Sequence, residues 1–526
     1  MKLTPFFLIG CMIAARCGAS AADNIVVMSP YEVSANSVDF RQWLKFETPH
    51  ITLYTDADLN DAARMAGEFE MLHLAAVKYL GRPSFKREPT IMILPTSKSD
   101  WRKVETSAKY EWKVAVSRPT SRIAGMIVVQ YDWQSFLQGG ADTIYSSLGQ
   151  LELQSMRLEG PLWFGTGIGG FFTTAKFEDN AVVLGKPTSR ARRMRRQEWL
   201  PWPQFFKVNS SSPEFTTKDG HRLFTGQSAA VVHHLLTNPD HVWRERLVRW
   251  TTLQQAGVEP TEAAFGQVFG YTWETWQKEM DEHVRDRSEM TSTVRFTKEE
   301  SDFPRTKAKL ETREMRELFV LAQILNQRIP ASETSLDLLL AKGLKTESLR
   351  GLLLEACIKW RRSEAAREQV RLLMDAGTSN PAIYATAAEN LFRSEVPAIK
   401  PRASVGDAAA ELRELCKKAL ALEPRHPEAS NLLAWTEALA PEVTPESLAV
   451  IDGLARTMSG VIPMQEIMGA LAVANWRAGN LKPARALAES LRDSAYSNKR
   501  GKEIAAAVLK ELDGPAPIKE RALEAP

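Results

Sequence analysis

The sequence predicts two folded parts: an α+β domain in which strands and helices alternate, followed by an all-α helical-repeat domain. Three observations support this division. Strand-like and helix-like hydrophobic patterns alternate up to about residue 290, a polar and charged stretch follows, and the apolar patterns after residue 312 have the helical period. The 526 residues provide enough chain for two or three hydrophobic cores.

The N-terminus has the features of an export signal. Lys2 precedes an apolar stretch over 3–15, and Ala-Ser-Ala at 19–21 forms a small-residue cleavage site. We therefore expect a signal peptide over 1–21, a tail over 22–40, and a mature protein that is periplasmic or secreted.

Charge and hydropathy argue against two kinds of partner. The formal net charge is +3, and residues 1–21 contribute +2 of it, so the mature chain lacks the positive field typical of nucleic-acid-binding proteins. No later segment is apolar enough to span a membrane, and we expect no integral membrane segment after signal cleavage. The sequence LIGC at 8–11 resembles a lipoprotein box, but it lies too early in the apolar stretch, so lipidation is the less favoured alternative.

The α+β domain is expected over 41–290. ITLYT at 51–55 alternates as a half-buried strand does, and the helical spacing that follows continues to Gly81. A second strand at 90–95 then gives a βαβ-like opening, with helices packed on a sheet. Further strands are expected at 122–130 and 175–185, and helices at 142–157, 162–174, 226–237, 242–255 and 272–285.

The helical repeats are expected over 312–512, after a linker at 291–311 and before a tail at 513–526. Helix pairs start near Thr346, Pro381, Pro427 and Pro463, at spacings of 35, 46 and 36 residues. ALALEPRHPEA and ALAVANWRAGNLKPARALAESL resemble tetratricopeptide repeats, and SEVPAIKPRASVGD is typical of an inserted loop. We expect this solenoid to fold alone and to bind a protein or peptide partner on its concave face.

The stretch PLWFGTGIGGFF at 161–172 contains the spacing G-x-G-x-x-G. A dinucleotide-binding loop of this kind follows a strand, opens a helix and has an acidic residue about 20 positions later. Here Pro161 and the polar RLEG precede the glycines, and Arg190 stands near the position of the acid. The context therefore argues against dinucleotide binding.

The same stretch belongs to a wider resemblance. RQWLKFETPHITLYTDA, TIMILPTSKSDW, RIAGMIVVQ and GPLWFGTGIGGFFTTAKFEDNAVVLGKP together resemble the peptidase-MA-like, gluzincin-type domain of exported bacterial proteins, which often carries tetratricopeptide repeats behind it. The resemblance covers roughly 41–290 and implies a zincin-like mixed α/β fold. In that family one helix bears H-E-x-x-H, and a Pro-Leu-Trp-x-x-Glu-Gly-like segment supplies the third zinc ligand.

The positions of that zinc site hold other residues in this chain. The resemblance places Ser146, Ser147 and Gln150 where the family has His, Glu and His, and Thr166 where it has the third-ligand Glu. Two histidines one helical turn apart grip zinc, and the Glu between them acts as general base. Neutral hydroxyls and an amide do neither, so we expect zinc to be lost, no cofactor, and a degenerate domain.

Other candidates for chemistry are weaker. His233 and His234 lie in an apolar helical pattern, where we expect one packed and one half-exposed ring rather than a metal pair. His73 is expected to be a core histidine. Cys357 and Cys416 lie in apolar helical patterns, which favours two buried free thiols over a disulfide.

Five arginines within seven residues form a candidate patch for an anion or a partner. A solvated helix face is the favoured interpretation of such a run in an exported protein. The arginines are Arg190, Arg192, Arg193, Arg195 and Arg196.

The sequence thus favours an exported pseudo-metallopeptidase that acts as a binding or scaffold protein, through its repeats and through its emptied cleft. An active hydrolase that uses a site outside the family positions is the alternative.

Overall fold

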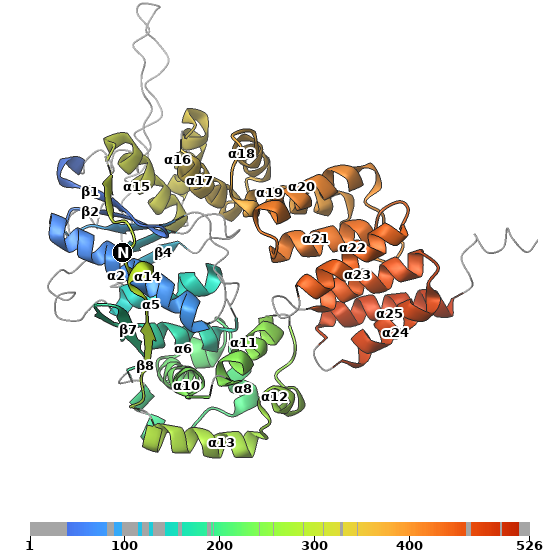
Figure 1. Cartoon of the computed structure of the whole chain (residues 1–526), viewed down its shortest axis with the longest axis horizontal. Helices are drawn as coiled ribbons and strands as arrows, with labels where there is room; N and C mark the ends of the chain where they lie inside the picture. Colours follow the sequence, from blue (N-terminus) through green and yellow to red (C-terminus); the bar gives the residue numbers. More distant parts are fainter. Residues whose placement is uncertain are drawn as a thin grey trace, which may run out of the picture.

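The computed structural model describes residues 39–514 except 81–88, 97–113, 118–125, 130–141, 156–159, 187–190, 327–329, 459–463, 495–496 and the single residues 193, 241, 256, 288, 309 and 345. The described chain is mostly helical, with a six-stranded and a three-stranded sheet in its first part. Figure 1 shows these sheets at one side of the molecule and a stack of helix pairs, ending in α25, at the other. The signal peptide expected over 1–21 and nearly all of both expected tails lie outside the described residues.

The larger sheet has the strand order β4-β5-β3-β2-β1-β9. β1 and β2 form an antiparallel pair, and β2, β3 and β5 run parallel. The helix α2 (Leu59–Leu80) makes the crossover that a parallel β2–β3 pair requires. β4 pairs antiparallel with β5 at one edge. The strands are β1 (Leu44–Glu47), β2 (Ile51–Thr55), β3 (Thr90–Leu94), β4 (Val114–Ser117), β5 (Met126–Val129) and β9 (Thr306–Ala308).

Helices cover both faces of this sheet. Ile51 and Leu53 of β2 belong to the core that includes α2, whereas Tyr54 packs with residues of α15 (Thr312–Asn326). The Tyr54 hydroxyl also donates a hydrogen bond to Glu314 of α15 at 2.8 Å. The expectation that ITLYT is half-buried is therefore wrong: all five residues of β2 are buried, because α15 covers the face that was expected to meet solvent.

The segment expected to be a linker at 291–311 is part of both sheets. β8 (Ser292–Arg295) pairs with β7, α14 (Lys298–Ser301) follows, and β9 pairs with β1. The linker prediction is wrong because edge strands bury little of their side chains, so their composition remains polar; two of the three β9 residues are exposed.

The remaining elements of the first part form a helical layer rich in aromatic side chains. α6 lies between α5 and α10 and packs closely against both. Trp163, Trp250 and Trp276 are fully buried in the same core. The elements are η1 (Phe40–Gln42), α5 (Asp142–Ser155), α6 (Leu162–Phe172), β6 (Lys176–Glu178), β7 (Ala181–Leu184), η2 (Met194–Arg196), α8 (Trp202–Lys207), α9 (Pro213–Thr216), α10 (Lys218–Thr237), α11 (Val242–Gln255), α12 (Glu262–Phe269), α13 (Trp273–Glu282) and the π-helical turn η3 (His283–Arg287).

The second part is built from successive helix pairs. Thr346 caps the first helix of one pair, and Pro381 and Pro427 begin the first helices of the next two, as their spacing predicts. Pro463 lies outside the described residues, next to the start of α23. The helices are α16 (Pro330–Lys342), α17 (Glu347–Lys359), α18 (Ser363–Asp375), α19 (Pro381–Glu395), η4 (Gly406–Ala408), α20 (Ala409–Leu422), α21 (Pro427–Ala438), α22 (Pro445–Thr457), α23 (Met464–Arg477), α24 (Leu481–Asp493) and α25 (Lys499–Asp513).

The hydrophobic cores do not divide at residue 312. α15 to α18 share one core with the outer face of the six-stranded sheet, and α19 contributes Ala382 and Ile383 to it. A separate core runs from Ala388 to Leu509. The two cores therefore divide within α19, between Ile383 and Ala388, and not at residue 312, where the boundary was expected.

Candidate functional site

The four positions that the resemblance assigns to a zinc site, Ser146, Ser147, Gln150 and Thr166, lie on two helices in direct contact. Ser146 and Gln150 of α5 face α6: the Gln150 amide donates to the carbonyl oxygen of Gly165 at 3.4 Å. A Cβ atom on Gly169 would lie 2.6 Å from the Ser146 hydroxyl. Ser147 is buried on α5. Ser146 and Gln150, the two α5 positions where the resemblance expects histidines, thus pack on the backbone of the next helix.

Thr166 is a half-buried residue in the first half of α6. Its hydroxyl donates to the carbonyl oxygen of Leu162, one turn earlier in the same helix, at 2.8 Å. The neutral Thr166 hydroxyl is therefore hydrogen-bonded within its own helix, and it places no charge near α5. Among the described residues, no group of three or more His, Cys, Asp or Glu side chains is placed to hold a metal ion.

The glycines of PLWFGTGIGGFF lie inside α6 and not in a loop. Gly169 faces α5, while Gly167 faces α10, where a Cβ would lie 2.4 Å from the Ser228 carbonyl oxygen. The third glycine of the G-x-G-x-x-G spacing, Gly170, also faces α10, near Ala229. Gly167 and Gly169 therefore allow close helix packing on two sides of α6, whereas a Cβ on Gly165 would meet nothing within 4 Å, and these glycines form no phosphate-binding loop.

A pair of histidine–carboxylate contacts beneath the sheet was not expected from the sequence. Nδ1 of His73 lies 2.5 Å from Glu152, and both side chains are buried. His50, at the start of β2, stacks on His73 with ring centroids 4.0 Å apart, and its Nδ1 lies 2.6 Å from Glu70. His73 is a core histidine, as predicted. Its carboxylate partner is 79 residues away in the chain, so no local pattern could indicate the pairing.

Glu70 is held as a carboxylate. Burial alone would raise its pKa, but hydrogen bonds from His50 and from the Thr48 hydroxyl outweigh that effect and lower the pKa below its ordinary value. The His50 side chain remains one-third exposed while its partner is buried. This is an imidazole oriented by an ionised carboxylate, the geometry of a general base.

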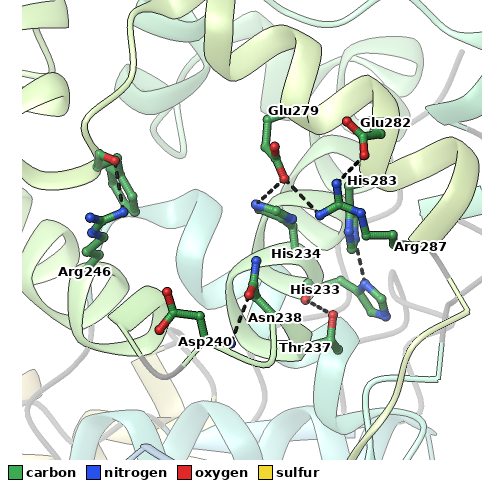
Figure 2. Close-up of polar contacts among 11 residues, drawn as sticks. His233, His234, Thr237, Asn238, Asp240, Arg246, Glu279, Glu282, His283 and Arg287 are labelled. Atoms are coloured by element: carbon green, nitrogen blue, oxygen red, sulfur yellow. Dashed lines mark hydrogen bonds and ion pairs between the residues drawn. The ribbon is translucent and has the colours of Figure 1, made fainter.

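A second histidine cluster joins α10 to the turn after α13 (Figure 2). His233 and His234 are both buried, so the expectation of one half-exposed ring is wrong. His233 hydrogen-bonds to His283, and the His234 ring packs edge-on against Trp243 and Trp276.

These three histidines are neutral at physiological pH. Burial, assisted by the positive Arg287, lowers the pKa of His234 to about 3. Burial also lowers the pKa of His283 to about 2, and that of His233 in the same direction. The nearest carboxylate, Glu279, lies 3.6 Å from His234 but also pairs with Arg287 at 3.2 Å, so it does not offset the burial.

Two arginines in the described part of the run contact the segment around η3. Arg195 donates to the carbonyl oxygen of Val284 at 2.9 Å, and Arg192 pairs with Glu289 at 3.1 Å. Arg196 is exposed. Arg190 and Arg193 lie outside the described residues, and two members of the run, Arg192 and Arg195, have intramolecular partners.

Two surface pockets are formed by described residues of the helical repeats. One, of about 560 Å³, is an apolar hollow between α22, α23 and α24, and Leu448 and Leu487 are part of its lining. The other, of about 510 Å³, lies between the inserted segment 397–401 and helices α23 and α25. Cys357 and Cys416 are buried free thiols in different cores, and burial raises the pKa of each to about 12.

Comparison with known proteins assigns no family to this chain. No family model and no curated protein sequence matches the chain. The solved structure of a thermophilic TPR protein from Thermus thermophilus is similar over 37% of this chain and 94% of its own, with 17% identity and a TM-score of 0.24. The assignment of helical repeats therefore rests on the helix pairs themselves. Within the described ranges, no helix combines the length and apolar character needed to cross a membrane.

Proposed function

We propose that the protein is an exported, non-catalytic binding protein, a degenerate relative of peptidase-MA-like domains whose helical repeats hold a protein or peptide partner. The contact between α5 and α6 carries the non-catalytic half of this proposal. Where an active relative would hold zinc, Ser146 and Gln150 pack on the glycines of α6. Neutral hydroxyl and amide groups are poor ligands for zinc and cannot act as a carboxylate base.

The stacked helix pairs support the binding half. Repeats that contact only their neighbours form extended surfaces and leave one face of each helix for a partner. Both pockets described above are formed by described residues of this part of the chain, and Val450 of α22 and Leu481 of α24 are large apolar side chains exposed to solvent. Export into the periplasm or medium is proposed from residues 1–21 alone.

Two measurements on the mature protein test the non-catalytic half. We expect elemental analysis to find no stoichiometric zinc, and a general protease assay to find no cleavage. One tightly held zinc ion per chain, together with proteolysis that a chelator abolishes, would refute this half of the proposal.

Photo-cross-linking tests the binding half. A p-benzoylphenylalanine in place of Val450 or Leu481 samples the repeats, and the same residue in place of Leu59 or Val242 samples the first part at equally exposed apolar positions. We expect one partner to cross-link from the repeat positions in cell-envelope extracts. A partner that cross-links only from Leu59 or Val242 would place binding in the α/β part.

A second candidate function is hydrolysis by a site outside the family positions. Its supporting observation is His50, partly exposed and oriented by the buried Glu70 carboxylate. A panel of fluorogenic peptides and esters tests it: activity that His50→Gln abolishes and His221→Gln retains would favour a hydrolase. Absence of activity in the parent protein excludes it for those substrates.

A further inference from the structure

The inserted segment expected from the long repeat step is folded onto the last helices of the solenoid. Arg402 pairs with Glu511 of α25 at 2.6 Å, and the Val405 amide donates to the carbonyl oxygen of Leu439. From α23, the Arg477 guanidinium donates to the carbonyl oxygens of Ala403 and Ala440. These bonds join a segment between α19 and α20 to three later helices.

This anchored segment forms one wall of the 510 Å³ pocket. Pro397 to Pro401 face α25 across it, and the two prolines restrict the backbone of that wall. The floor is apolar and comes from Val473 of α23 and Ile504 and Ala507 of α25. A pocket of this size matches the range in which proteins bind small ligands or a few residues of a peptide.

The rim of the pocket is positively charged. Lys400, Lys499 and Arg500 line it together with a single acid, Glu503. The acids near these cations contact them only loosely: Lys499 lies 3.8 Å from Glu503, and Arg500 lies 3.6 Å from Glu466, just outside the lining. Lys499 and Arg500 also begin α25, whose N-terminal amides favour a negative charge.

We propose that this pocket binds a peptide segment that presents an apolar side chain next to a carboxylate. The side chain would lie on the apolar floor, and the carboxylate would meet Lys400 and Arg500 at the rim. This assignment rests on the proposed binding function and names the chemistry of its partner. The carboxylate can come from an Asp or Glu side chain or from the C-terminus of a peptide, and both present the same group.

Fluorescence anisotropy with the mature full-length protein and three labelled peptides tests the assignment. N-acetyl-Ala-Leu-Glu-Ala-amide carries a side-chain carboxylate, N-acetyl-Ala-Ala-Leu carries a free C-terminus, and N-acetyl-Ala-Leu-Gln-Ala-amide is neutral. We expect at least one acidic peptide to bind ten-fold or more tightly than the neutral one. The tighter of the two identifies the source of the carboxylate, and its affinity should fall as salt is added.

Variants place the binding in the pocket. The double variant Lys400→Gln with Arg500→Gln should weaken the acidic peptide at least ten-fold, because both side chains are exposed and the fold does not depend on them. The control is Lys502→Gln with Lys510→Gln, two exposed positions of α25 outside the lining, and it should bind as the parent does. Thermal melts of both variants check that the fold is retained.

Results that contradict the pocket assignment can be distinguished from results that contradict the proposed function. Three results would overturn the pocket assignment: equal affinity for the neutral peptide, no binding of either acidic peptide, or no effect of the pocket variant. In each case, cross-linking from the repeats would still support the proposed function. If the protein forms a dimer that the pocket variant dissociates, the pocket binds a second copy of the chain, and the peptide assignment is also overturned. Loss of cross-linking from the repeats would instead refute the proposed function.

Discussion

Nδ1 of His233 lies 2.9 Å from Nε2 of His283 in a core that excludes solvent from both rings. Nε2 of His233 contacts the carbonyl oxygens of Gly185 and Met290, so it must carry its proton and donate. A neutral His233 then accepts at Nδ1, and His283 donates from Nε2. The bond that joins α10 to the turn after α13 therefore fixes one tautomer for each ring.

Acidification should destabilise the fold through these histidines. Their folded pKa values lie below the ordinary value of 6.5, so below that pH the unfolded chain binds more protons than the folded one, and stability falls. Between pH 7 and pH 5 we expect a loss of about 2 kcal/mol for each histidine that stays neutral in the folded state. Urea unfolding across this range measures the slope.

The variant His283→Gln should make that slope shallower, since one titrating ring is gone and the amide can still donate to His233. His221→Gln, at a half-buried position outside the cluster, is the control. Carboxylates with lowered pKa values, such as Glu70, add to the loss only below their ordinary value of 4.5. A stability that stays constant from pH 7 to pH 5 would contradict the neutral cluster.

Two substitutions in α6 should have effects of opposite sign. A Cβ on Gly167 would lie 2.4 Å from both the Ser228 carbonyl oxygen and the Val232 side chain, so Gly167→Ala should destabilise by about 2 kcal/mol or more. A Cβ on Gly165 meets nothing within 4 Å, so Gly165→Ala should stabilise by about 0.5–1 kcal/mol through helix propensity. Paired urea melts decide the signs, and equal effects would show that α6 does not pack on α10 in this register.

We expect a fragment to fold stably only if its ends match the boundaries of the hydrophobic cores, and not if it ends at the expected linker. A fragment 22–311 would expose the sheet face that α15 covers, including Tyr54 and Ile93, and we expect it to aggregate. The fragment 22–378 retains α15 to α18 and should melt cooperatively. A soluble, cooperative 22–311 would show that α15 is dispensable to the sheet.

Export should end in cleavage after Ala21, because the small residues at 19–21 fit a signal-peptidase site. Edman sequencing or mass spectrometry of the exported chain gives its first residue. A lipid-modified Cys11 there would identify the earlier lipoprotein box as the true signal, and an intact Met1 would mean that the segment is retained.

The sequence predicted what depends on local pattern and not what depends on distant partners. The helix starts at Thr346, Pro381 and Pro427 follow from capping and proline preferences, which act within one turn. The pairing of β9 with β1 and the burial of β2 beneath α15 depend on contacts across more than 250 residues, and no local period encodes them. The glycines of α6 were noticed for the spacing of Gly165, Gly167 and Gly170, but only the positions of α5 and α10 show that Gly167 and Gly169 are the ones that close packing requires.

β9 has a consequence for the order in which the molecule can form. The strand that it joins, β1, is among the earliest elements of the chain, whereas β9 ends at residue 308, so the register Lys45↔Ala308 closes a loop of most of the first part. Until that loop closes, β1 presents an open hydrogen-bonding edge to other chains. Such non-local pairing is slow to form. A nascent chain that does not yet include residue 308 therefore holds an unfinished sheet, and during this interval its open strand edge is exposed to aggregation and to proteases.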